Sequence, residues 1–277
     1  MKYGIDVAQW QGNIDWSKVK KDFAILKVTK KDNTIEPKFL ANYKGATANG
    51  IPVGVYRYVY AKNTTQAKAE ADAIVKILSG LNITCGVWLD MEDASIKSLG
   101  KNTLTNIINV MANTIKASGL NVGIYCNRDW FLNVLDGSRL AKTYPFWIAR
   151  YPLRDTGAFN PNSTISPKAY AKAWQYSQRG KVNGIVGDVD MDVMFDDALI
   201  GALPTPNVPS VYYPKYTGNS ISIVVALSAV GEKDTSKAHR KMIASANGIK
   251  SYSGTTTQNT QMLNLLKQGK LRKNNLQ

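Results

Sequence analysis

Short apolar runs alternate with amphipathic segments from the N-terminus to about residue 135. The runs have the composition of buried strands and cover residues 3–7, 23–29, 52–60, 86–92 and 121–126. The segments between them have a helical period and lie around residues 16–22, 37–49, 64–79, 103–118 and 128–135. Apolar strands separated by helices are typical of a parallel sheet that is covered by helices.

Three further strand-like runs follow, at residues 146–151, 171–177 and 189–195, but no helical period lies between them. The connection 152–170 contains three prolines, and 178–188 is a glycine-rich stretch of eleven residues. A parallel crossover needs about a dozen residues or more, usually with a helix, so the last strand should run antiparallel to its neighbour. We therefore predict an α/β fold, a modified TIM-like (β/α)5β3 barrel.

Proline marks the end of this pattern, because four prolines lie within residues 201–214. Such a composition is typical of a semi-rigid linker. We predict a barrel at residues 1–200, a Pro-rich linker at 201–210 and a small, basic α+β domain at 211–277. A domain of this size without disulfides or metal has a thin core, so we expect a partner or self-association to stabilise it.

The composition excludes several classes of protein. The chain is 44% hydrophobic, and it has neither an apolar run of the about 18 residues that cross a bilayer nor an apolar segment of the secretory kind at its start. We therefore expect synthesis in the cytoplasm without a signal peptide. The single histidine, His239, excludes a His-based zinc centre and a Ser-His-Asp triad, and we expect it at the surface. Cys85 and Cys126 are expected to be core thiols.

Positive charge gathers in the C-terminal part. The formal net charge is +15, and residues 208–277 carry ten Lys and Arg against two Asp and Glu. This bias favours a polyanionic partner such as nucleic acid, anionic lipid or an acidic wall polymer, and a solvated basic face is the alternative. Few aromatic residues are interleaved with the basic ones, which argues against nucleic acid.

Two acids stand side by side in the run "VWLDME". Residues i and i+2 of a strand point to the same face, so Asp90 and Glu92 should project together at the end of the fourth strand, where barrel enzymes place their chemistry. Asp6 ends the first strand and Asp190 begins the eighth, which neighbours the first in a closed barrel. We therefore predict that four carboxylates meet at one mouth of the barrel.

Paired carboxylates suit the hydrolysis of glycosidic bonds, which needs a proton donor and a second carboxylate. Crowded carboxylates raise one another's pKa, which keeps one protonated near neutral pH. We assign the proton donor to Glu92, the longer side chain and the one nearer the mouth, while Asp90 either holds Glu92 or orients a substrate amide. Two alternatives stay open: acids that cap a helix, and a site for Mg²⁺ or Ca²⁺.

Several linked motifs resemble glycoside hydrolase family 25, the lysozymes that cut the bond after N-acetylmuramic acid in peptidoglycan. They are "GIDVAQWQGNIDW", "GVYRYVYA", "VWLDMED", "FWIARY" and "AWQYSQRGKVNGIVGDVDMDVM", which together span residues 1 to about 198. The resemblance implies catalytic roles for Asp6, Asp90, Glu92 and Asp190, with Glu92 as the general acid and with no metal or other cofactor. It also implies that Lys27, Tyr58 and Tyr125 line the substrate cleft. We add Trp174 as a candidate for stacking on a sugar, the alternative being a place in the barrel interior.

The chain departs from the family at two places. Arg57 stands where many members have His, and "KVTKKD" replaces a common T-E-G after the second strand. Both are expected to touch the substrate cleft rather than the acids, so they should affect glycan preference.

The order of the parts resembles phage endolysins, and "YYPKYTGNS" is similar to the cell-wall-binding ends of endolysins from phages of clostridia. The resemblance implies a muramidase that binds the peptidoglycan and wall polymer of a Gram-positive host and has no nucleic-acid or membrane partner. It would be made in the host cytoplasm and reach the wall after holin-type release. The alternative function is a non-catalytic glycan-binding protein on a decayed barrel.

Overall fold

The computed structural model describes residues 1–201 and 212–273 of the 277-residue chain. The chain divides into two compact units, Met1–Leu203 and Pro204–Gln277. Apart from Gly201, the predicted linker at 201–210 lies outside the described residues. Each unit has its own hydrophobic core.

Eight strands of the first unit close into one barrel in the order of the sequence. Strands β1 to β7 pair in parallel, whereas β8 lies antiparallel between β7 and β1. The fold and the direction of the last strand confirm the prediction. The strands are β1 (Lys2–Val7), β2 (Phe23–Lys27), β3 (Val53–Tyr58), β4 (Val87–Asp90), β5 (Val122–Asn127), β6 (Phe146–Ala149), β7 (Ala173–Gly180) and β8 (Val189–Met194).

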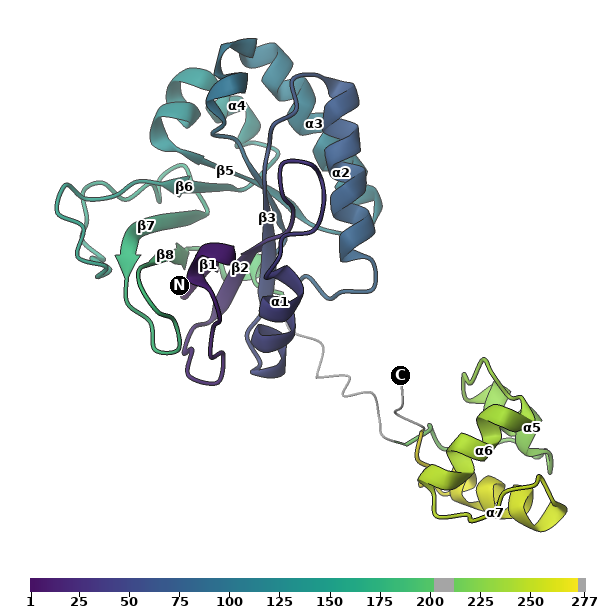
Figure 1. The fold of residues 1–277 in the computed structure, drawn as a ribbon. Coiled ribbons are helices and arrows are strands. Elements are labelled where there is room, and N and C mark those ends of the chain that lie inside the picture. The colour runs from purple at the N-terminus through teal and green to yellow at the C-terminus, as the bar shows by residue number, and fades with distance from the viewer. Residues whose placement is uncertain (202–211, 274–277) are drawn as a thin grey trace. The chain divides into compact units, whose positions relative to one another are not determined.

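Helices cover the outside of β2 to β5. The main ones are α1 (Phe39–Ala48), α2 (Thr64–Leu78) and α3 (Lys101–Ala117), of which α2 and α3 lie side by side (Figure 1). A π-helical turn (Trp130–Val134) and the short α4 (Gly137–Leu140) follow β5. None of the helices in residues 1–201 and 212–273 is long and apolar enough to cross a membrane.

The helix predicted around residues 16–22 does not form. A 3-10 turn (Gln9–Gln11) and irregular turns join β1 to β2 instead. Trp16 and Val19 are buried, and Trp16 Nε1 donates a hydrogen bond to Asn42 Oδ1 on α1 at 3.3 Å. The apolar spacing that indicated a helix therefore comes from two side chains that anchor a loop against α1.

Large aromatic side chains fill the interior of the barrel. The rings of Trp88 and Trp147 meet edge to face at 5.8 Å between centroids, and both are 1% exposed. Gly123 on β5 leaves room for Trp88, since a Cβ at Gly123 would lie 2.3 Å from that ring. Inward-facing side chains of a small barrel pack into a solid core, so chemistry takes place at an end of the barrel and not along its axis.

The second unit contains α5 (Ile223–Ala229), α6 (Lys237–Ala246) and α7 (Thr256–Lys267). Its β structure, within the described residues, is one antiparallel bridge between Tyr212 and Arg272. His239 is partly exposed, with its side chain 17% accessible, and its Nε2 lies 3.2 Å from Glu232 Oε2. Cys85 and Cys126 in the first unit are both free and buried.

Candidate active site

A cavity of about 220 Å³ lies at the end of the barrel where β1 to β6 end and β8 begins. Glu92, two residues beyond β4, is half-buried and acts electrostatically on Tyr58 and Asp90, so it lies at the same mouth. The structure therefore brings the four predicted acids to one end of the barrel. The cavity is lined by Asp6, Lys27, Tyr56, Tyr58, Asp90, Tyr125, Trp147, Tyr151, Gln175, Gln178 and Asp190.

Asp6 and Asp190 are direct neighbours across the antiparallel pair of β1 and β8. Asp6 is 5% exposed, and its Oδ2 accepts a hydrogen bond of 2.6 Å from Gln175 Nε2. Burial raises the pKa of Asp6 well above its usual value, and the charges of Asp190 and Asp192 raise it further. Burial, helped by Asp155, raises the pKa of Asp190 to about 6.

Asp192 is a fifth acid that the sequence analysis missed. It is fully buried, and Trp147 Nε1 donates to its Oδ1 at 3.0 Å. Burial and the charge of the neighbouring Asp190 raise the pKa of Asp192 well above its usual value. The charge of Asp192 in turn raises the pKa of Asp6, so both buried acids resist ionisation. The spacing Asp190-x-Asp192 is the same as Asp90-x-Glu92 and would have indicated a shared face.

Asp90 is 4% exposed and lies in register between Tyr58 on β3 and Tyr125 on β5. Burial and the neighbouring Glu92 raise its pKa well above the usual value, although Lys27 lowers it. Among the described residues, no group donates a hydrogen bond to Asp90 Oδ1. An unpartnered buried oxygen is costly, which suits an atom that substrate contacts.

Glu92 has a raised pKa because burial outweighs the hydrogen bonds from Asn127 that lower it. The capping alternative is wrong for this pair, because Asp93 is the residue whose side chain caps a 3-10 turn, accepting from Ser95 N at 2.9 Å. The described residues also contain no group of three or more His, Cys, Asp or Glu side chains arranged to hold a metal ion. The geometry favours proton chemistry at these acids.

Gln175 links the two sides of the cavity. Its Oε1 accepts hydrogen bonds from the hydroxyl of Tyr125, at 2.8 Å, and from that of Tyr151, while its Nε2 binds Asp6. The sequence analysis missed Gln175 and Tyr151 as site residues. Trp147, Ala149 and Tyr151 follow one another at every second position, which places their side chains on one face. This spacing could have identified Tyr151 as a site residue.

Trp174 does not line the cavity, which corrects its predicted role. It is 2% exposed, its Nε1 donates to the carbonyl oxygen of Arg150 at 2.7 Å, and its ring packs near Phe159 and Tyr176. Because Gln175 points into the barrel, its neighbour Trp174 must face the outer layer. The aromatic residues around Trp174 did not indicate which side chains of this strand point into the barrel.

Arg57 also faces away from the cavity, contrary to the expectation that it touches the cleft. It is 0% exposed and forms an ion pair with Glu70 on α2, with Nε and Oε2 at 3.1 Å. The inward side chains of β3 are Tyr56 and Tyr58, which line the cavity. Any effect of Arg57 on substrate must therefore pass through other residues.

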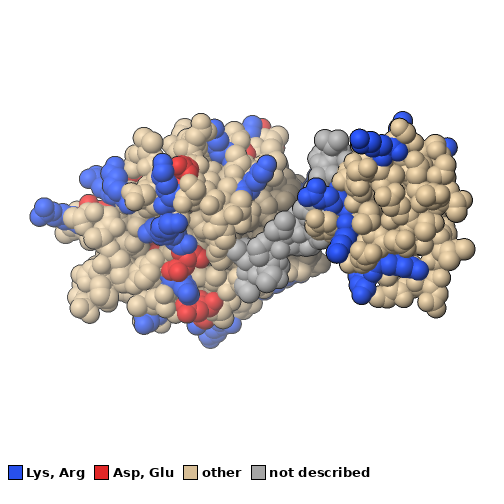
Figure 2. All heavy atoms as spheres, turned by 90° about the horizontal axis from the view of Figure 1, so that it is seen from below, with Lys and Arg blue, Asp and Glu red and all other residues tan. Residues whose placement is uncertain are grey.

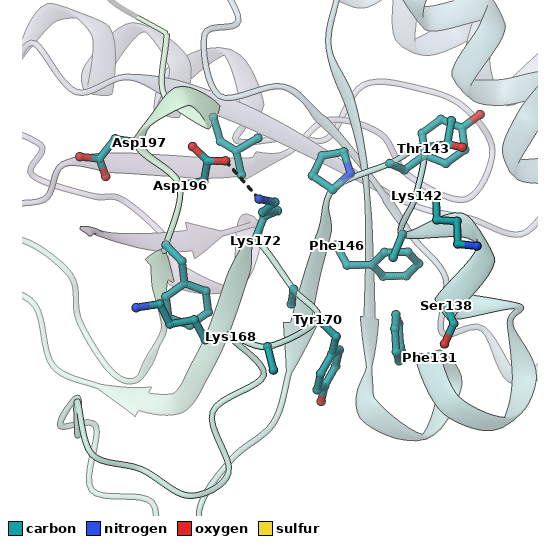
Figure 3. Close-up of a pocket in the computed structure, with 17 residues that line it drawn as sticks. Phe131, Ser138, Lys142, Thr143, Phe146, Lys168, Tyr170, Lys172, Asp196 and Asp197 are labelled. Carbon is teal, nitrogen blue, oxygen red and sulfur yellow. Dashed lines mark ion pairs between the residues drawn. The ribbon is translucent and has the colours of Figure 1, made fainter.

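A larger cavity of about 840 Å³ lies at the opposite end, where β6 and β7 begin and β8 ends (Figure 3). Its acids are engaged in ion pairs: Asp196 with Lys172 at 3.5 Å and Asp197 with the N-terminal amine at 3.3 Å. None of the buried carboxyl groups with raised pKa lines this cavity. Volume alone therefore does not identify the active site, because the buried acids with raised pKa values lie at the smaller cavity.

The chain was compared with known proteins. Residues 5–185 match the family described as Glycosyl hydrolases family 25. Lysozyme M1 of Streptomyces globisporus is 34% identical over 200 residues, covering 68% of this chain and 65% of that protein. The autolytic lysozyme of Clostridium acetobutylicum is 28% identical over 201 residues, covering 72% of this chain and 57% of that protein. The chain therefore spans less than two thirds of the length of either relative.

A crystal structure of a bacterial lysozyme from Streptomyces coelicolor has the same fold. It matches with a TM-score of 0.55 and 29% identity, covering 70% of this chain and 92% of that one. The matched 70% of this chain is close to the share of the chain that lies in the first unit, which contains the site described above. On the extent of the match, this chain belongs to glycosyl hydrolases family 25.

Proposed function

We propose that the barrel is an N-acetylmuramidase, which hydrolyses the β-1,4 bond between N-acetylmuramic acid and N-acetylglucosamine in bacterial peptidoglycan. The observation that carries this proposal is the gathering of Asp6, Asp90, Glu92 and Asp190 at one mouth, all with raised pKa values. Hydrolysis of a glycosidic bond needs a carboxylic acid that is still protonated near neutral pH. The two relatives named above are lysozymes, which supports a glycan substrate.

Glu92 donates the proton to the leaving oxygen in this mechanism. It is half-buried at the rim, and its raised pKa keeps a share of it protonated when water-exposed glutamates are ionised. Once the proton has left, the hydrogen bonds from Asn127 stabilise the carboxylate that remains. The same residue can then take a proton from the incoming water.

Asp90 orients the substrate. Its Oδ1 has no partner among the described residues, and the charge of Glu92, two residues beyond the end of β4, acts on it. An N-acetyl sugar carries an amide N–H that can donate to this oxygen, which would hold the acetamido group next to the bond being cut. Asp190, whose pKa of about 6 leaves it largely ionised at neutral pH, supplies negative charge from the opposite side of the mouth to support positive charge developing on the sugar.

The reaction is tested by digesting purified peptidoglycan. We expect new reducing sugar ends and no new free amino groups, because a muramidase cuts the glycan and leaves the peptides intact. New amino groups without reducing ends would identify an amidase or peptidase and refute the proposal. Sedimentation with intact walls and no release of either product would support the alternative, a non-catalytic glycan-binding protein.

The role of Glu92 is tested by Glu92→Gln, which keeps the shape and removes the proton. We expect a loss of at least about 100-fold in turnover, the usual contribution of a general acid. Asp93→Asn is a matched control, because this neighbouring acid caps a 3-10 turn. Unchanged turnover in Glu92→Gln would move the acid role to another residue.

We further propose that the second unit binds the cell wall. Residues 208–277 carry ten Lys and Arg against two acids, and blue side chains stand among tan ones on the face in Figure 2. A cavity of about 300 Å³ in this unit is bordered by Lys241 and Lys250. Val225 on α5 is 51% exposed and offers an apolar contact for the wall or for a second copy of the unit.

Wall binding is tested with the full chain carrying Glu92→Gln, so that the walls stay intact. We expect Lys241→Glu with Lys250→Glu to reduce cosedimentation with Gram-positive walls, and DNA not to compete. Cosedimentation that is unchanged by the two substitutions and abolished by DNA would instead favour a nucleic-acid partner. Gel filtration over a range of concentrations measures self-association.

We also infer an endolysin role, in which the enzyme is made in the cytoplasm of a phage-infected host and reaches the wall after holin-type release. The order of barrel and basic unit and the similarity of the tail to endolysin ends support this inference. The test is expression in a Gram-positive host with and without a pore-forming protein. Lysis is expected only when the membrane is permeabilised, and lysis without it would refute this route.

A further inference from the structure

Arg57 fixes the loop that follows β2. Its guanidinium donates to Thr29 Oγ1 at 2.7 Å, to the carbonyl oxygen of Lys30 and to Asn33 Oδ1 at 2.8 Å, in addition to its ion pair with Glu70. Arginine offers several donors in a fixed plane, so one buried side chain can hold several points of a loop. Three residues of this network, Arg57, Thr29 and Lys30, belong to the two places where the chain departs from its family.

The loop is also closed by its own backbone. Lys30 N donates to Thr34 O at 2.8 Å, and Glu36 N donates to Val28 O at 3.0 Å. Asn33 takes the left-handed conformation, with φ at 66°, that lets the chain reverse. Side chains at the tip of the loop therefore project from a fixed frame.

Lys31, in this loop, contacts the first of two neighbouring tyrosines, and the second of these lines the cavity. Its Nζ lies 4.9 Å from the ring centroid of Tyr60, which lies 5.0 Å from the ring of Tyr58. Tyr58 lines the cavity, and Lys27 Nζ lies 5.7 Å from its ring. We call these four residues the basic–aromatic strip: Lys27, Tyr58, Tyr60 and Lys31.

The backbone of the strip is held in place by the partner of Arg57. Tyr60 N donates to Glu70 Oε1 at 3.2 Å, so the same carboxylate orients Arg57 and the end of β3. Lys31 and Tyr60 are thus tied to the barrel through one buried ion pair. Their spacing is a property of the folded barrel and not of a free loop.

Neither lysine of the strip is within ion-pair distance of a described carboxylate, although the charge of Lys27 lowers the pKa of Asp90. No acidic side chain of residues 1–201 or 212–273 forms an ion pair with Lys27 or Lys31, whereas the adjacent Lys30 pairs with Asp32 at 3.5 Å. Tyrosine has an apolar ring and a polar hydroxyl, which suits contact with a sugar, and an ammonium held over the ring face can also attract an anion. The strip therefore suits a glycan that carries a negative group some distance from the cleaved bond.

We propose that the basic–aromatic strip binds a carboxylate of the peptide that is attached to the muramic acid residue. This proposal rests on the proposed muramidase function. The sugar rings of peptidoglycan are neutral amides and alcohols, and the anionic groups of the polymer without its secondary polymers are the carboxylates of its peptides. Lys31 contacts Tyr60, and neither residue lines the cavity, so Lys31 is the part of the strip suited to a substituent of the glycan.

The test compares Lys31→Gln with Lys30→Gln on peptidoglycan freed of secondary wall polymers, so that no phosphate remains. Each variant acts on native material and on material whose carboxylates are converted to amides. We expect kcat/KM of the unaltered chain to fall about three- to fivefold on amidation, the range of an exposed charge pair. Lys31→Gln should start at the lower value and show no effect of amidation, while Lys30→Gln should respond as the unaltered chain does.

Two results would overturn the proposal: an equal effect of amidation on Lys31→Gln and on the unaltered chain, or identical behaviour of the two lysine variants. Lys31→Arg keeps the charge and should keep the preference for native material. Binding to native and amidated material, measured in the Glu92→Gln background with and without Lys31→Gln, gives a readout without turnover. If the unaltered chain releases no reducing ends but the chain still binds native material more tightly than amidated material, the muramidase proposal fails. The proposal that the strip binds peptide carboxylates would then still stand.

Discussion

Asp190→Asn is expected to stabilise the barrel at neutral pH while it reduces activity. Burial raises the pKa of Asp190 from 3.8 to about 6, which corresponds to about 3 kcal/mol because each pKa unit is about 1.4 kcal/mol. The folded chain binds this proton more tightly than the unfolded chain does. The unaltered barrel therefore loses up to about 3 kcal/mol of stability as the pH rises from about 4 through about 6.

Asparagine has no proton to lose, so the variant lacks this penalty. Its free energy of unfolding should exceed that of the unaltered chain by up to about 3 kcal/mol at pH 8, and the difference should vanish near pH 4. Removal of Asp190 also removes a charge that raises the pKa values of Asp6 and Asp192, which acts in the same direction. In thermal unfolding the gain corresponds to about 6–12 °C for a unit of this size.

Tryptophan fluorescence during urea unfolding is the appropriate assay, because all six tryptophans lie between Trp10 and Trp174 and report on the barrel alone. Asp188→Asn is the matched control, since Asp188 is exposed and pairs with Lys181 at 2.7 Å at the surface. It should not show the pH-dependent gain. If Asp190→Asn raised the free energy of unfolding equally at pH 4 and pH 8, or lowered it at pH 8, the idea that burial destabilises the ionised form of Asp190 would be refuted.

Three further predictions follow from the same geometry. Glu92 must be protonated to act as the acid, and burial raises its pKa above the usual 4.5. The value of kcat/KM should therefore fall as the pH rises through that raised pKa. A constant kcat/KM from pH 4 to pH 9 would contradict this. Glu70→Gln should destabilise the barrel by about 3–5 kcal/mol in urea unfolding because it leaves Arg57 charged and buried; a cost below about 1 kcal/mol would contradict this. Trp174→Ala should reduce the free energy of unfolding by about 3–5 kcal/mol and leave KM unchanged, because this side chain is 2% exposed and does not line the cavity; a raised KM with unchanged stability would contradict this.

The alternation of apolar and polar positions was enough to predict most of the barrel. It predicted all eight strands, the helices after β2, β3 and β4, and the antiparallel direction of β8. It failed at residues 16–22, where Trp16 and Val19 have the spacing of a helix but anchor a loop. Periodicity reports which residues are buried, and a loop that is fastened at two points can have the same pattern as a short helix.

The candidate site was only partly accessible from the sequence. Spacing alone places Asp90 and Glu92 on one face, and strand order places Asp6 next to Asp190. The sequence did not indicate that Gln175 would join Tyr125 to Asp6, because these residues are distant in the chain and meet only when the barrel closes.

The sequence by itself determined the strand order, the family and the end of the barrel at which the acids lie. Only the tertiary structure decided which face of each strand points inward, as Trp174 and Arg57 demonstrate. Strands of a parallel barrel are buried on both sides, so both faces are apolar and a pattern of period two cannot tell the inside from the outside. Closure of the barrel makes that choice, and with it brings Asp6 close enough to Asp192 for the charge of Asp192 to raise the pKa of Asp6.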